Sequence, residues 1–445
     1  MKRVVRIGGV AALAVLLFVA GAIGLFRSAA DDSAQGSAPK TVASADTLLA
    51  PAIGGSLDQT IENLQSRLRV LPTDWQAFAS LGLAYVQQAR VTADPSYYPK
   101  AQGVLRRSLG LERDDNFAAM VGMAALAAAR HDFAGALRWG EQAKSINPYN
   151  GNVYGVIGDA QVELGRYRDA FATFQTMVDT RPGVASYARV SYARELMGDV
   201  PGAVQAMEAA RDIAGTPADA AWASYQLGEL FFNQGQLAAA AHAYARGVDM
   251  DADYVPSFAG LAKVAWARGH LQEAIAGYTD VVSRYPAPEY VIALGDLYTA
   301  AGQPEQADRQ HALVHAEEQL FRANGVNIDL ELALFDAAHG DPAGALAAAR
   351  DEWAKRQSVH VADAYAWALH ADGRDAEAAI YARKAMALGY RNALFAFHAG
   401  MIQLELGNRA EARRLLSEAL RINPHFSIQY SPLARATLTT IGGAA

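Results

Sequence analysis

The strongest constraint on this chain is a pair of small residues that recurs at a fixed spacing. Eight glycines are each followed five residues later by an alanine: Gly165, Gly198, Gly235, Gly269, Gly302, Gly340, Gly373 and Gly407 precede Ala170, Ala203, Ala240, Ala274, Ala307, Ala345, Ala378 and Ala412. Ala101 and Ala136 extend the series, and the ten alanines are separated by 35, 34, 33, 37, 34, 33, 38, 33 and 34 residues. The 445-residue chain is therefore expected to repeat a unit of about 34 residues.

The repeated unit is predicted to be a pair of helices. About one residue in five is Ala, the best helix former, and Pro is rare within the periodic stretches. Each glycine follows an apolar-periodic segment of about a dozen residues, where a left-handed C-terminal helix cap is expected. The sequence therefore predicts an all-α fold of helical hairpins.

The repeat resembles that of the tetratricopeptide family. The third unit carries the resemblance most clearly, with Tyr154, Ile157, Gly158, Gly165, Tyr167, Ala170, Phe174 and Pro182 at the family's motif positions. The resemblance covers residues 56–426 and implies a right-handed α-solenoid of about ten hairpins with a long concave groove. Residues 427–445 lack the period and are expected to cap the last hairpin and end in a tail.

Residues 1–27 are predicted to be a transmembrane anchor. Three basic residues lie within residues 1–6, and residues 7–26 are uncharged and mostly apolar. Twenty helical residues rise about 30 Å, enough to cross the bilayer core. The basic residues favour a single pass through the cell membrane with the body outside the cytoplasm. The small residues Ser28, Ala29 and Ala30 leave secretion after signal cleavage open, and residues 28–55 are expected to form a flexible linker.

Charge and composition exclude several classes of function. Without the four basic residues of the first 27, the chain has 35 basic and 46 acidic residues, so a nucleic-acid partner is not expected. Cysteine is absent, which excludes disulfides, thiolate nucleophiles and cysteine-ligated metals. The common hydrolase, nucleotide-binding and metalloprotease motifs are also absent. We expect neither an enzyme nor a small-molecule substrate nor a cofactor.

Two weaker patterns concern metals. His311 and His315 stand four residues apart with Glu318 nearby, which is metal-ligand spacing on one helix face. The sequence shows no third convergent ligand, so a solvated or packed pair is favoured and no metal site is expected. The acids at 249, 251 and 253 imitate a calcium loop, but Tyr254 stands where glycine is required. These acids are instead expected to lie in a solvated turn between two repeats.

A partner-binding groove is predicted on the first helices of the central hairpins. The residues expected to face it are Asn152, Asp159, Tyr192, Trp222, Tyr225, Glu229, Phe232, Asn233, Lys263 and Trp266. They mix aromatic side chains with acids and amides, as binding interfaces do. Lys263 is their only base, so the family's basic clamp for a C-terminal carboxylate is not expected. The groove would prefer a basic or apolar extended segment.

The leading functional hypothesis is a membrane-tethered, non-catalytic scaffold that binds a peptide segment or partner protein, in envelope assembly or maturation. One alternative is a substrate-recruiting or regulatory subunit of an envelope enzyme, of the glycosyltransferase or cytochrome-maturation type. Another is a metal-dependent enzyme that uses the histidine pair. Fold resemblance does not choose the partner.

Overall fold

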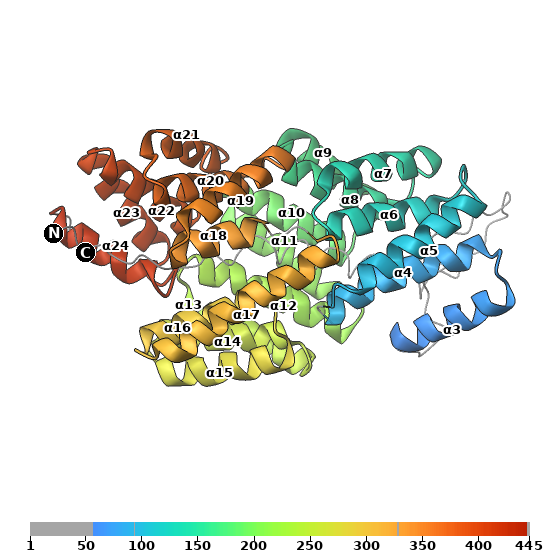
Figure 1. Ribbon diagram of the computed structural model, residues 1–445, viewed down its shortest axis with the longest axis horizontal. Coiled ribbons are helices and arrows are strands. Elements are labelled where there is room, and N and C mark those ends of the chain that lie inside the picture. The colour runs from blue at the N-terminus through green and yellow to red at the C-terminus, as the bar shows by residue number, and fades with distance from the viewer. Residues whose placement is uncertain (1–56, 93, 327–328, 443–445) are drawn as a thin grey trace.

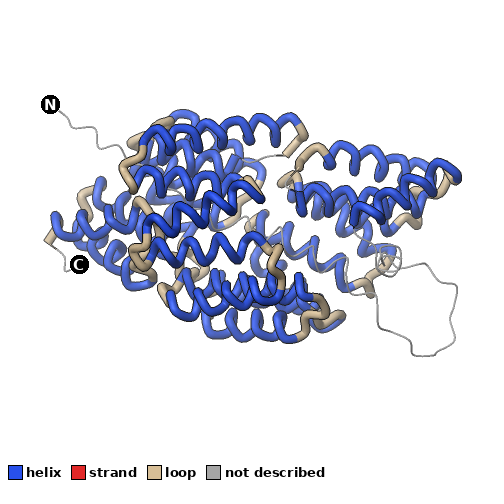
Figure 2. The backbone as a smooth tube through the Cα atoms, turned by 90° about the horizontal axis from the view of Figure 1, so that it is seen from below, coloured by secondary structure: helices blue, strands red, loops and turns tan. Residues whose placement is uncertain are grey.

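The computed structural model describes residues 57–442, except for residues 93, 327 and 328 (Figure 1). These residues form twenty-two helices, α3 to α24, and no strand, as Figure 2 shows. The predicted anchor and linker, residues 1–27 and 28–55, lie outside the described part of the chain. Within the described part, none of the helices combines the length and apolar character needed to cross a membrane.

Ten antiparallel hairpins follow one another along the solenoid. They are α4 (Trp75–Thr92) with α5 (Tyr97–Leu111), α6 (Phe117–Ala129) with α7 (Phe133–Ile146), α8 (Gly151–Glu163) with α9 (Tyr167–Thr180), α10 (Val184–Leu196) with α11 (Val200–Asp212), α12 (Pro217–Asn233) with α13 (Leu237–Met250), α14 (Val255–Ala267) with α15 (Leu271–Arg284), α16 (Pro288–Ala300) with α17 (Pro304–Ala323), α18 (Asp329–His339) with α19 (Pro342–Lys355), α20 (Val359–Ala371) with α21 (Asp375–Ala385), and α22 (Ala393–Glu405) with α23 (Arg409–Ile422). Helix α3 (Leu57–Val70) precedes them, and α24 (Tyr430–Thr440) packs on α23.

The recurring small residues have the structural roles that the sequence predicted. All ten alanines lie in the second helices of the hairpins and are at most 3% exposed. All eight glycines adopt φ between 69° and 99°, the left-handed conformation that ends a first helix. The two longest alanine spacings have a simple cause, because they contain the 17-residue α12 and the 20-residue α17.

Large side chains from the second helices pack on glycines of the first helices. We call the position four residues after each repeat alanine the packing position; in six hairpins it holds a large buried apolar residue, namely Leu105, Phe174, Met207, Tyr244, Tyr278 or Leu416. A Cβ atom at Gly158 would lie 2.3 Å from the Phe174 ring, and one at Gly228 would lie 2.2 Å from the Tyr244 ring. Glycine therefore allows the two helices of a hairpin to approach closely.

The solenoid also contacts itself at long range. Turns within early hairpins touch the connections between late hairpins, through contacts that we call the seam. Its hydrogen bonds include Tyr285 Oη to Arg90 O at 3.3 Å, Gln357 N to Glu163 O at 2.9 Å, Val359 N to Tyr167 Oη at 2.6 Å, Tyr390 Oη to Glu195 Oε1 at 3.4 Å and Asn423 Nδ2 to Phe232 O at 2.8 Å.

Because of the seam, early hairpins contact the parts of the solenoid that follow them by between five and six hairpins. The hydrogen bonds named above join residues that are 191 to 195 positions apart, from the first hairpin with the connection α15–α16 to the fifth hairpin with the connection α23–α24. In Figure 1 the orange and red helices accordingly lie beside the teal and green ones. The inner surface of this solenoid is therefore bounded by the chain's own later hairpins.

Candidate functional site

The ten predicted binding residues all lie on first helices, in α8, α10, α12 and α14. Six of them are less than 9% exposed: Asn152, Tyr192, Trp222, Tyr225, Glu229 and Phe232. The other four, Asp159, Asn233, Lys263 and Trp266, are partly exposed. Only these four offer appreciable surface to a partner in this conformation.

The buried aromatic residues of the set contribute to the core. Trp222 packs with Met207 and Leu227 in an apolar cluster between α11 and α12. The Tyr225 ring lies 5.8 Å from the Tyr244 ring and 6.1 Å from the Tyr254 ring. A first helix packs on its own second helix and on the second helix of the preceding hairpin, and to a smaller extent on neighbouring first helices. An aromatic residue that would be exposed on an isolated hairpin can therefore be buried by the neighbouring hairpins.

The charged residues of the set join neighbouring first helices. Asp159 of α8 accepts two hydrogen bonds from Arg189 of α10, Nε to Oδ1 at 2.8 Å and Nη2 to Oδ2 at 2.6 Å. Glu229 of α12 accepts from Lys263 Nζ of α14 at 2.6 and 2.7 Å, and from the Tyr244 hydroxyl at 2.6 Å. In both pairs an acid on one first helix meets a permanent cation on the next.

The same arrangement recurs at alternate hairpin junctions. Asp296 of α16 faces His339 of α18 with 3.6 Å between Oδ1 and Nε2, and Asp363 of α20 contacts His398 of α22 at 2.9 Å. We call these four acid–base contacts the bridging pairs. The four pairs are buried or partly buried, and such pairs disfavour wrong neighbours because a buried charge without its partner is costly.

The chain's own C-terminal segment, residues 423–430, covers part of the predicted binding face. Asn423 binds the backbone of Phe232, and the His425 ring meets the Trp266 ring edge-on at 6.3 Å between centroids. Further along, the Gln429 amide donates to Asp296. The segment thus crosses α12, α14 and α16 before α24 begins.

The buried carboxyl of Glu195 in α10 makes the stability of the folded chain depend on pH. Burial raises the pKa of this carboxyl from 4.5 to about 7, and the charge of Glu229 adds to the shift, while hydrogen bonds from Tyr390 and Asn233 oppose it. At a pH between 4.5 and about 7, this carboxyl is protonated in more of the folded molecules than of the unfolded molecules. The stability contributed by this group is therefore complete below pH 4.5 and is lost as the pH rises through about 7.

The variant Glu195→Gln tests this effect. We expect it to exceed the unmodified chain in free energy of unfolding by about 1 to 3 kcal/mol at pH 8, because the amide needs no deprotonation. The gain should shrink at pH 5. Urea unfolding followed by circular dichroism at both pH values measures this gain in stability. An equal gain at the two pH values would contradict a raised pKa of Glu195.

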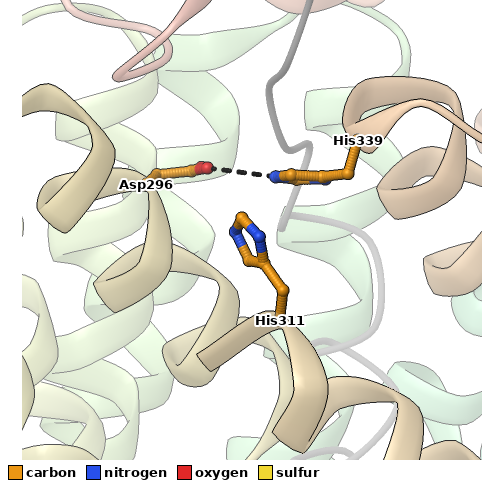
Figure 3. Close-up of side chains that lie close together, drawn as sticks. All are labelled: Asp296, His311 and His339. Carbon is orange, nitrogen blue, oxygen red and sulfur yellow. Dashed lines mark ion pairs between the residues drawn. The ribbon is translucent and has the colours of Figure 1, made fainter. Parts of the chain in front are cut away.

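The weak metal patterns have different outcomes. His315 contacts Glu318 at 3.7 Å with its side chain 52% exposed, so these two remain a surface pair. His311 instead turns toward Asp296 and His339, and one donor atom from each of these three residues lies within 4.8 Å of the others (Figure 3). Asp251 accepts a hydrogen bond from Asp253 N in the turn before α14, as expected of turn acids.

Comparison with known proteins supports the repeat type. The family model described as Tetratricopeptide repeat matches residues 395–426. This segment is similar to a tetratricopeptide repeat. It comprises most of α22 and all of α23, and the other hairpins of the described chain have the same two-helix form. No curated protein matches the chain.

Several solved structures are similar to this one. The APC/C hetero-tetramer Cut9–Hcn1 matches with 16% identity over 85% of this chain and 81% of that chain, with a TM-score of 0.42. A tetratricopeptide repeat protein from Parabacteroides merdae matches with 14% identity over 65% of this chain and 99% of its own, with a TM-score of 0.34. MamA protein matches with 18% identity over 38% of this chain and 92% of its own, with a TM-score of 0.29.

Proposed function

We propose that this chain is a non-catalytic scaffold that binds a peptide segment or a partner protein. The observation that carries the proposal is the uninterrupted stack of tetratricopeptide-like hairpins from α4 to α23. Such a stack presents side chains from many consecutive hairpins along one continuous surface. A surface of this kind suits extended protein segments better than small molecules.

The scaffold is further proposed to be tethered to the cell membrane, with its body outside the cytoplasm. The basic residues within 1–6 and the apolar residues 7–26 support this proposal. Residues 28–55 would act as the linker between membrane and solenoid. A tethered scaffold of this type would serve envelope assembly or maturation by collecting a partner close to the membrane.

The partner is proposed to bind beside the C-terminal segment, on the exposed edges of α12 and α14. Asn233, Lys263 and Trp266 lie there, and none of the three is fully buried. Trp266 is the aromatic anchor of this surface, since an indole concentrates binding energy more than most side chains. Tyr225 and Phe232, two buried members of the predicted set, pack in the same apolar cluster as Trp266 and support the surface from below.

Site-specific photo-crosslinking in native membranes tests this proposal. A photoreactive phenylalanine analogue replaces Trp266 on α14 in one variant and the exposed Gln272 on the second helix α15 in a control variant. We expect a discrete crosslinked partner from position 266 and none from position 272. Crosslinks from position 272 alone would move binding to the second helices, and none from either position would contradict binding at this hairpin.

A further inference from the structure

Three groups that commonly ligate metals meet between α16, α17 and α18. Asp296, His311 and His339 come from three different helices, and one donor atom of each lies within 4.8 Å of the other two (Figure 3). Asp296 is only 3% exposed, and Nε2 of each histidine is buried without a hydrogen-bond partner among the described residues. Buried polar atoms are nearly always satisfied, so this cluster requires an explanation.

The bridging pairs show what is unusual about Asp296. In the pairs of α8 and α12 the acid receives direct hydrogen bonds of 2.6 to 2.8 Å from Arg189 or Lys263. Asp296 faces His339 Nε2 at 3.6 Å, which is beyond hydrogen-bond distance. Asp296 therefore lacks the direct contact with a basic side chain that the acid of each of the other three bridging pairs has.

The orientation of His339 directs Nε2 at this carboxylate. Its Nδ1 lies 2.7 Å from the carbonyl oxygen of Phe335. A carbonyl oxygen only accepts, so Nδ1 carries a proton. When Nε2 carries none, Nε2 and Asp296 Oδ1 face each other as two acceptors, which a metal ion would satisfy. A histidine held by its Nδ1–H in this way is the usual arrangement of a metal ligand.

His311 stands where other hairpins have an apolar side chain. It lies four residues after Ala307, at the packing position that holds Phe174 in the third hairpin and Tyr244 in the fifth. Its ring packs on Gly295, where a Cβ atom would lie 3.0 Å from His311 Nε2. An imidazole is a poor replacement for an apolar ring here unless its nitrogen gains a bond.

We propose that Asp296, His311 and His339 bind one Zn²⁺ ion. Two imidazole nitrogens and one carboxylate oxygen form a common zinc ligand set, with water in the fourth position. Tetrahedral bonds of about 2.0 to 2.1 Å place donor atoms roughly 3.4 Å apart, close to the present separation of His339 and Asp296. His311 needs a small side-chain movement to complete the site. The sequence alone predicted no metal here, because residues 296 and 339 lie far along the chain from the pair His311 and His315.

The ion would have a structural role at the least regular part of the solenoid. It would join the seventh and eighth hairpins, where α17 is the longest helix and the alanine spacing reaches 38 residues. Gln429 donates to the same Asp296, so the site would also hold the C-terminal segment in place. Both the curvature at this junction and the cover over the binding face would then depend on zinc.

Metal titration of the full-length chain in detergent tests the proposal. The protein is purified through a tag without histidine, stripped with a chelator and titrated with ZnCl₂ by calorimetry. We expect one ion per chain, a rise in melting temperature with zinc, and the visible spectrum of tetrahedral cobalt after loading with Co²⁺. His311→Phe should abolish these signals while keeping the fold, because it restores the residue type found at the packing position in the third hairpin.

Matched variants separate this site from surface binding. His315→Ala removes a histidine of the same helix outside the cluster and should leave zinc affinity unchanged. Gln429→Leu, which removes the hydrogen bond from the Gln429 amide to Asp296, should weaken zinc affinity by about 10- to 100-fold. If the stripped chain takes up no zinc, or if His311→Phe binds it as tightly as the unmodified chain, the proposal is wrong.

Discussion

Arg356→Ala is expected to destabilise the chain by about 3 to 5 kcal/mol, because it removes the cation from a buried charge cluster. Arg356 lies at the end of α19 and is 4% exposed. Its Nη1 donates to Glu163 of α8 across the seam at 2.9 Å, and its Nε donates to Glu352 of its own helix. Both glutamates are buried, and burial already raises the pKa of Glu163. The variant would leave two neighbouring carboxylates without the Arg356 charge.

Urea unfolding of the full-length chain at neutral pH measures this loss. The matched control is Arg166→Ala, which removes an arginine of the same region from an ion pair with Asp169 that is 2.7 Å long but about half exposed. Exposed pairs contribute about 0 to 1 kcal/mol, so this control should change little. Equal effects of the two variants would show that Arg356 is not buried in the seam.

Gly198→Ala is expected to be the second most damaging of these changes. Gly198 has φ of 77°, and a Cβ atom there would lie 2.4 Å from the carbonyl oxygen of Gly389 across the seam. Alanine at such a φ costs about 1 to 2 kcal/mol wherever it occurs. The overlap with the later turn should add about 1 to 3 kcal/mol, because backbone on both sides would have to move.

Gly373→Ala isolates the contribution of the seam. Gly373 ends a first helix in the same way, with φ of 76°, but a Cβ atom there would meet nothing within 4 Å. Both variants share the backbone strain, so the difference between their thermal stabilities reports the contact with Gly389. If the two alanine variants melt at the same temperature, the early and late turns do not touch.

The sequence predicted the helical hairpins but not the closure of the solenoid. The repeat alanines and the glycine caps are local features, and each determines how one hairpin meets the next. Four of the five hydrogen bonds named for the seam have a backbone group on at least one side, such as the carbonyl oxygens of Glu163 and Phe232, which any residue supplies. Such contacts across about 190 residues leave no pair of matching side chains to recognise in the sequence.

The burial of six of the ten predicted binding residues could not be foreseen from the sequence, for a related reason. All ten residues lie on the predicted helices, but a hairpin alone does not reveal that Trp222 and Tyr225 are covered by neighbouring hairpins. The pairing of Asp159 with Arg189 likewise depends on which first helices adjoin. For the metal cluster one local signal existed, since His311 occupies a packing position that is apolar in other hairpins.

The closure of the solenoid on itself can be tested by crosslinking introduced cysteines, because the natural chain contains none. Gln234 in the fifth hairpin contacts Arg391 before α22, with Gln234 Nε2 3.3 Å from the Arg391 carbonyl oxygen. The variant Gln234→Cys/Arg391→Cys should be joined within one chain by a short bismaleimide. The control Arg268→Cys/Arg391→Cys uses the equivalent turn of the next hairpin and should not be joined. Crosslinking of the first pair alone is the predicted result; a first pair that reacts no better than the control would contradict the closed solenoid.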